Sequence, residues 1–225
     1  MATTKAPSLA LLDTSVGKKA ALAVSGVILF GFVIGHMLGN LQVLEGPEVF
    51  NAYAEGIKSK PVLLWGVRLL LVTALLVHTT LVLELYGKSV AARPVAYKVK
   101  KNIATSYAAT MMKVTGPLLL VYIIFHLAHF TFPGTALGDY EHVPGDVYAN
   151  FVNAFQIPWV VAVYVFANLM LSMHLYHGAF SMLQSVGLSH PRYDKRLKYA
   201  ARGLAFLVTA GNVFLPLTVL LGLVK

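Results

Sequence analysis

The chain has 225 residues, of which 57% are hydrophobic and only 12% charged, and its mean hydropathy is +0.70. A water-soluble domain normally carries about a quarter charged residues, so the composition argues against a soluble enzyme and indicates a chain that lies in a lipid bilayer. The net charge of +9 does not indicate a nucleic-acid ligand, because the basic residues gather in particular connections between apolar segments.

Five apolar segments are long enough to cross a bilayer as helices, which takes about 20 residues each. They cover residues 20–43, 61–86, 111–132, 158–183 and 200–224. We therefore predict an all-α integral membrane protein in which five transmembrane helices form a single domain over residues 1–225. The first segment is too long for the core of a signal peptide and is interpreted as a retained span.

The segments outside the spans carry weaker signals. Asp13, Thr14 and Ser15 are candidate caps for the first helix. The first connection contains a helix-compatible stretch at 48–58, which we expect to lie along the membrane surface. The third connection, 133–157, is predicted to be a loop because glycine and proline recur in it.

Charge placement predicts the orientation of the helices. Most lysines and arginines lie before the first span and in the second and fourth connections, whereas most acidic residues lie in the first and third. Basic connections stay in the cytoplasm, so we expect a cytoplasmic N-terminus and an external C-terminus in the cell's inner membrane. Trp65 and Trp159 then fall at outer helix ends, where amphipathic rings are favoured. The basic connections suit either anionic lipid headgroups or an acidic protein surface.

Six of the eight histidines fall inside the predicted spans, where ionisable groups are costly and usually functional. They are His36, His78, His126, His129, His174 and His177. His36 lies 17 residues beyond Lys19, about 25 Å along an outward-running helix, and His126 also lies in the outer half of its span. On the inward-running helices, His78 and His174 lie near the inner ends. The sequence therefore predicts an outer layer of His36 and His126 and an inner layer of His78 and His174.

Two neutral imidazoles on opposite sides of a macrocycle are the axial ligands of a b-type haem iron, so we expect two haems b. The chain has no cysteine, which excludes disulfides, thiolate-held iron–sulfur clusters and covalent c-type haem within it. Gly26 and Gly116 each precede an outer-layer histidine by ten residues, which puts them near the depth of the inner layer. There they would leave room for a haem edge or, alternatively, for tight helix packing.

His129 and His177 each follow a layer histidine by three residues and so lie on nearly the same helix face. They are competing ligands or partners of haem propionates, and we favour the second role. Arg68 lies near the outer layer and either pairs with a propionate or snorkels to the headgroups. Three further polar side chains are candidates for quinone or proton contacts: Ser25, Asn40 and Glu84.

The segments around these histidines resemble those of a known family. They are GHMLGN (35–40), LLVHTT (75–80), KVTG (113–116), FHLAHF (125–130) and SMHLYHG (172–178). Over almost its whole length the chain is similar to the single-chain, five-helix, dihaem cytochrome b anchor of succinate:quinone oxidoreductases, the class of succinate dehydrogenases and fumarate reductases. One haem histidine on each of the first four helices and none on the fifth is the specific part of this resemblance.

The resemblance implies that His36 and His126 ligate the haem distal from the catalytic subunits, and that His78 and His174 ligate the proximal haem. It also implies a flavoprotein and an iron–sulfur subunit on the cytoplasmic side, with menaquinone as the membrane carrier. His129 and His177 depart from the family's four-histidine pattern. Whether the complex is a monomer or a trimer stays open.

Two other classes fit part of this pattern. Buried histidines also form proton relays in transporters that bind no haem, although we find neither inverted repeats nor broken helices in the sequence. Another quinone-linked oxidoreductase, such as a nitrate reductase or a formate dehydrogenase, also uses a dihaem anchor but has different partners.

Overall fold

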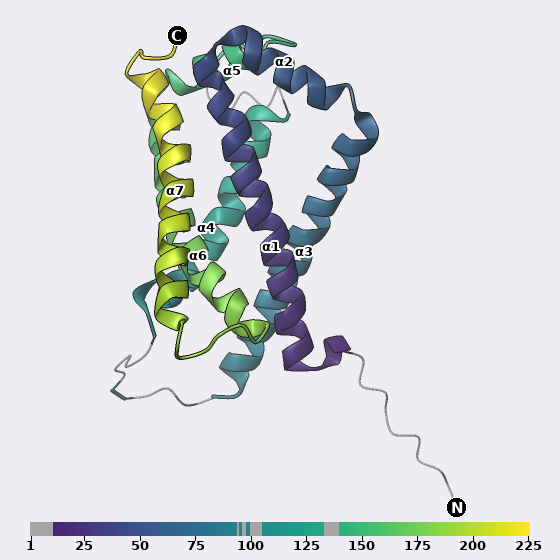
Figure 1. The fold of residues 1–225 in the computed structure, drawn as a ribbon, viewed down its shortest axis with the longest axis vertical. Coiled ribbons are helices and arrows are strands. Elements are labelled where there is room, and N and C mark those ends of the chain that lie inside the picture. The colour runs from purple at the N-terminus through teal and green to yellow at the C-terminus, as the bar shows by residue number, and fades with distance from the viewer. Residues whose placement is uncertain (1–10, 94, 96–97, 100–104, 133–139) are drawn as a thin grey trace, which may run out of the picture.

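The computed structural model describes residues 11–93, 95, 98–99, 105–132 and 140–225, and over these residues it is helical, with no strand. Five helices are long and apolar enough to cross a membrane, which confirms the prediction (Figure 1). They are α1 (Ser15–Asn40), α3 (Pro61–Ala91), α4 (Tyr107–Phe130), α6 (Pro158–Ser185) and α7 (Asp194–Leu220). The shorter elements are η1 (Leu11–Asp13), η2 (Leu41–Glu45), α2 (Pro47–Lys58) and α5 (Val147–Phe155).

Three helices, α1, α4 and α7, begin before the predicted apolar segments and end two to four residues before those segments do. Thr14 is the cap of α1, because its side chain accepts a hydrogen bond of 3.0 Å from the Gly17 N–H. Likewise, α7 begins at Asp194, well before the predicted start at residue 200. Hydropathy marks only the part of a helix that lies in hydrocarbon, so it places these polar helix starts too far inside.

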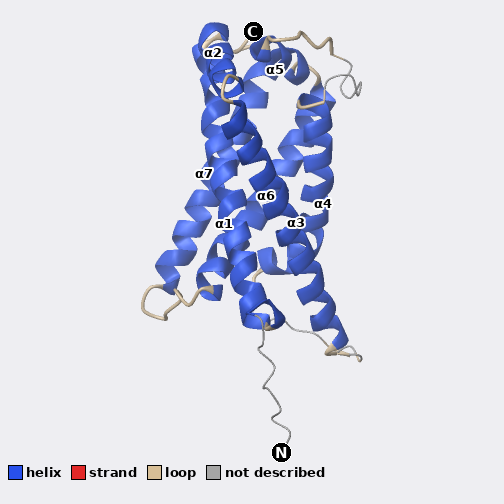
Figure 2. Cartoon of the chain, turned by 90° about the vertical axis from the view of Figure 1, so that its right-hand side faces the viewer, coloured by secondary structure: helices blue, strands red, loops and turns tan. Residues whose placement is uncertain are grey.

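The five long helices pack through α6 and α1. α6 packs against α7, α4 and α1, and α1 also packs against α3, which it crosses in Figure 1 (Figures 1 and 2). Several combinations are missing from the closely packed pairs of described elements, among them α1 with α4 and α3 with α6. The backbones of these two combinations stay apart, so only side chains or a ligand can bridge them.

Two short helices cover the end of the bundle at which the chain ends, the end that the charge pattern predicts to be outside (Figure 2). α2 confirms the helix predicted at 48–58. α5 corrects the loop predicted at 133–157, of which 133–139 lie outside the described residues. α5 forms because Asp146 caps it and because Phe151 and Phe155 on it are buried in the same core as Phe50 of α2.

Asp146 and Asn51 tie these two helices together. The carboxylate of Asp146 accepts hydrogen bonds from the Ala149 N–H at 2.9 Å and from Asn51 Nδ2 at 3.0 Å. Asn51 Oδ1 accepts in turn from the Tyr148 N–H at 3.0 Å. The bonds from Ala149 and Asn51 hold the pKa of Asp146 below its usual value, because they favour the ionised carboxylate.

Asp146→Ala should destabilise the protein by about 0.5–2 kcal/mol, the usual cost of losing an N-cap. Because the folded pKa is depressed, the charge contributes stability above the unfolded pKa of about 3.9, and this contribution is lost as pH falls through the folded pKa. Asp146→Asn keeps a capping oxygen without the charge, and should flatten this pH dependence while retaining most of the stability at neutral pH. Thermal unfolding in detergent from neutral pH to about pH 3 checks both outcomes.

Candidate functional site

The structure brings four intramembrane histidines together as two pairs. The rings of His36 on α1 and His126 on α4 have centroids 5.7 Å apart and planes inclined at 75°. The rings of His78 on α3 and His174 on α6 have centroids 6.3 Å apart and planes inclined at 51°. These are the outer and inner pairs that the positions along the helices indicate.

The separation within each pair suits a metal atom between two imidazoles. Two metal–nitrogen bonds of about 2 Å, plus about 1 Å from each nitrogen to the centre of its ring, separate two opposed ring centroids by about 6 Å. Each pair also joins two helices that do not pack closely against each other, α1 with α4 and α3 with α6. The imidazoles therefore meet across gaps between helices rather than inside a tight helix contact.

Three of the four imidazoles are held at Nδ1 by a hydroxyl group on the helix packed beside them. Ser25 Oγ lies 3.3 Å from His78 Nδ1, Thr115 Oγ1 lies 3.5 Å from His174 Nδ1, and Tyr164 Oη lies 3.0 Å from His126 Nδ1. These contacts fix the ring orientations, as second-layer hydrogen bonds do for metal-binding histidines.

The hydrogen-bond directions leave Nε2 free for a metal. The Ser25 hydroxyl donates to the Leu22 carbonyl oxygen at 2.9 Å, so it accepts from His78 Nδ1–H. The Thr115 hydroxyl lies 3.9 Å from Met112 Sδ, a weak acceptor for its proton. A neutral imidazole carries a single N–H, so a histidine that donates from Nδ1 has an unprotonated Nε2 that can bind a metal.

His36 is held differently. Its ring stacks on Phe32, with centroids 5.3 Å apart and planes within 11°. Asn40 Nδ2 lies 3.4 Å from its Nε2, which is the nitrogen that the other histidines keep free. Metal binding through Nε2 would displace this long contact.

Space is available around the pairs. A Cβ on Gly26 would lie 3.7 Å from His78 Cε1, an ordinary van der Waals contact, so this position faces the inner pair. A Cβ on Gly116 would have no neighbour within 4 Å, so it faces open space. His36 is exposed although it lies well inside a span. Of the two glycines singled out in the sequence, Gly26 therefore faces His78 of the inner pair, and Gly116 follows Thr115, whose hydroxyl contacts His174.

The donor set fits a b-type haem better than a bare ion. Within the described part of the chain, no group of three or more His, Cys, Asp or Glu side chains could hold a metal. Two imidazoles alone leave a metal short of ligands, whereas a haem supplies four planar nitrogens of its own and needs only two axial ones. Imidazoles that meet in pairs at this spacing and open space beside Gly116 fit such a group.

The other predicted residues lie around these pairs. His129 is buried, with Nδ1 2.9 Å from Tyr164 Oη. His177 is half-buried one turn from His174, and within the described residues its ring meets no second histidine. Arg68 is exposed, with its guanidinium 5.0 Å from the centre of the Trp65 ring.

Glu84 forms ion pairs that link α1 and α3 near their predicted cytoplasmic ends. Its carboxylate pairs with Lys18 and lies 3.1 Å from Lys88 Nζ. The sequence indicated Glu84 as a candidate for quinone or proton contact. In the structure, its partners are these two lysines.

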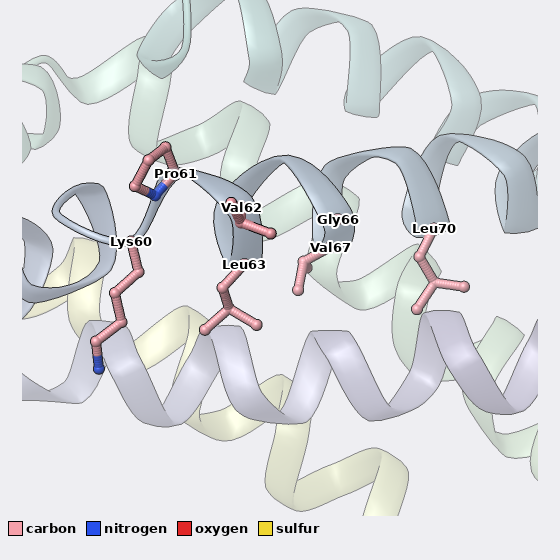
Figure 3. Close-up of a pocket in the computed structure, with 7 residues that line it drawn as sticks. All are labelled: Lys60, Pro61, Val62, Leu63, Gly66, Val67 and Leu70. Atoms are coloured by element: carbon pink, nitrogen blue, oxygen red, sulfur yellow. The ribbon is translucent and has the colours of Figure 1, made fainter.

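A separate groove of about 560 Å³ lies along the first turns of α3, where its side chains face α1 (Figure 3). Lys60 is the one charged residue among those that line it, and the others are Pro61, Val62, Leu63, Gly66, Val67 and Leu70. Such a lining suits hydrocarbon chains and offers no group for chemistry.

Among the three hydroxyl residues that contact the histidines, Ser25 was predicted only as a quinone or proton contact, and Thr115 and Tyr164 were not predicted, although a signal was present. Ser25-Gly26 on α1 and Thr115-Gly116 on α4 stand at the same distance before His36 and His126. Each hydroxyl residue reaches a histidine on the helix packed beside it. The helices α1 and α3 thus contribute residues equivalent to those of α4 and α6. Each histidine pair takes one histidine from α1 or α3 and the other from α4 or α6.

Comparisons with known proteins give no family. No protein-family model, curated protein or solved structure matches the chain. The function must therefore be argued from the residues and from the geometry of the two histidine pairs.

Proposed function

We propose that this chain is the cytochrome b membrane anchor of a succinate:quinone oxidoreductase of the succinate dehydrogenase class. In this role it carries electrons between a cytoplasmic iron–sulfur subunit and menaquinone in the inner membrane. The observation that carries the proposal is the pair of opposed imidazoles at two positions along the bundle, 5.7 and 6.3 Å between ring centroids. The succinate and fumarate chemistry then belongs to a partner flavoprotein.

His36 and His126 would hold the outer haem b, and His78 and His174 the inner one. When bound, each haem supplies a centre that gains and loses one electron. The chain itself would provide the histidine nitrogens that hold the haems; Ser25, Thr115 and Tyr164 contact three of the four imidazoles, and apolar helices surround them. On the predicted orientation, α2 and α5 cover the outer end of the bundle, and the basic connections face the iron–sulfur subunit.

The choice of complex rests on the resemblance of the histidine segments. One ligand on each of α1, α3, α4 and α6 and none on α7 is the family's arrangement, and the histidines that it pairs are the ones whose rings meet. A transporter with a histidine proton relay would have no need for imidazoles opposed at the spacing of a metal.

Purification of the complex in mild detergent tests this proposal. We expect a flavoprotein and an iron–sulfur protein to co-purify with the chain, and a dithionite-reduced spectrum to show two b-type haems per chain. A preparation without iron or Soret absorption would exclude the electron-carrier role. Two haems together with molybdenum-containing partners would assign the chain to a nitrate reductase or formate dehydrogenase complex instead.

A further inference from the structure

We propose that Tyr164 is a positioning residue for the outer histidine pair, and that it makes His129 a hydrogen-bond donor to an oxygen atom of a ligand beside that pair. This inference rests on the proposed function, because it takes His126 as an iron ligand. It assigns a role to a tyrosine that no sequence pattern singled out and a specific donor atom to His129.

Tyr164 lies on α6 with 4% of its surface exposed. Its Oη is 3.0 Å from His126 Nδ1 and 2.9 Å from His129 Nδ1. A phenol has one proton, so it donates to one of these nitrogens and accepts from the other. If His126 binds iron through Nε2, its own proton is on Nδ1 and is donated to Tyr164. The Tyr164 proton is then donated to His129 Nδ1.

The donation from Tyr164 to His129 determines which nitrogen of His129 carries the proton. With Nδ1 accepting, the single proton of the neutral ring is on Nε2. His129 is 3% exposed, and its Nε2 is buried with no hydrogen-bond partner in the described part of the chain. Buried donors without an acceptor are rare and costly. The Nε2–H of His129 is therefore a donor that lacks its acceptor.

The ring of His129 is held in place by its neighbours. It stacks on Phe125, with centroids 5.4 Å apart, and contacts Phe130 at 4.4 Å. The Tyr140 ring closes another side at 5.3 Å, and the Tyr140 hydroxyl donates to the His129 carbonyl oxygen at 2.9 Å. A ring held in this way keeps its donor aimed at one place, where an oxygen acceptor fits.

The acceptor is an oxygen atom, which two groups in a complex of this kind can supply. A propionate of the outer haem and a carbonyl of a quinone both offer an oxygen lone pair. A carboxylate would give the stronger, charge-assisted bond, whereas a carbonyl would make His129 part of a quinone site.

Tyr164→Phe in the intact complex tests the positioning role, with Tyr122→Phe as the matched control. Tyr122 lies one turn before His126, with its ring 5.4 Å from that of Tyr164, and its hydroxyl pairs with Asn168. Donation from Nδ1–H makes an axial imidazole more basic, which stabilises ferric iron. We therefore expect Tyr164→Phe to raise the midpoint potential of one haem and to shift its low-spin EPR signal, while the other haem is unchanged. Tyr122→Phe should leave both haems as in the wild type.

The outcomes separate this inference from the proposed function. Wild-type complex without haem would overturn both. Wild-type complex with two haems, and identical potentials and EPR spectra for Tyr164→Phe and Tyr122→Phe, would overturn the positioning role alone.

His129→Phe tests the donor and keeps the inference falsifiable if Tyr164→Phe fails to assemble. A several-fold rise in the half-saturating concentration of a soluble menaquinone analogue would identify a quinone carbonyl as the acceptor. An unchanged half-saturating concentration with a shifted potential of one haem would identify a propionate. If neither quantity changes, His129 donates to no ligand and this part of the inference is wrong.

Discussion

Alanine in place of His36 or His126 should leave the complex with one haem per chain instead of two. Each of these imidazoles opposes the other across a gap between helices that do not pack closely, at 5.7 Å between centroids. Within the described part of the chain, no third histidine ring lies opposite His36. Loss of either imidazole therefore removes one side of a two-sided site, and low-spin ligation fails.

Alanine in place of His78 or His174 should also leave one haem per chain, but here the remaining haem is the one assigned to His36 and His126. The sharpest measurement is the comparison of the haem that remains in each variant. The His36 and His126 variants should share one residual optical and EPR spectrum and one midpoint potential, and the His78 and His174 variants should share a second set. Members of a pair that left different haems would show that the pairing is wrong.

His177→Ala is the matched control for these variants. It removes an imidazole from the same span, one turn from His174, but one that faces no other histidine ring in the described structure. Both haems should remain. If all four pair variants also kept two normal low-spin haems, the ligands would lie elsewhere.

The long helices and the depth of each histidine could be predicted from sequence because both depend on local quantities. Twenty apolar residues fix a span, and a fixed rise per residue fixes the height of His36 or His174 within it. Successive spans run in opposite directions, which fixes which histidines share a layer, and charge placement predicts which layer is the outer one. The contacts between His36 and His126 and between His78 and His174 follow these heights.

What could not be predicted depends on which helices lie side by side. Serine and threonine are common in membrane helices and usually bond to their own backbone, so the matched spacing of Ser25 and Thr115 does not by itself predict that they reach histidines on α3 and α6. Tyr164 lies far from His126 and His129 in sequence, and only the packing of α6 on α4 brings it to them. α5 was missed because its nine residues follow a proline-glycine turn and are stabilised by burial against α2 rather than by length.

Gly116→Leu should remove the inner haem, although the structure itself shows open space at this position. A Cβ on Gly116 meets no atom within 4 Å, so the first carbon of a larger side chain is accommodated there. Thr115, the adjacent residue, contacts His174, so Gly116 lies at the depth of the inner pair. A leucine side chain would then occupy the volume that the edge of a macrocycle needs, and the haem content should fall from two to one per chain.

The control is Gly66→Leu on α3, where a Cβ also has no neighbour within 4 Å but the residue lines the apolar groove beside α1. It should keep two haems, and so should Gly116→Ala, because a single methyl group fills little of the space. Two haems in Gly116→Leu would mean that no cofactor edge reaches α4 at this depth. Loss of one haem in Gly116→Leu but not in Gly66→Leu would show that the cofactor fills the space beside Gly116, since a Cβ at either position meets no protein atom within 4 Å.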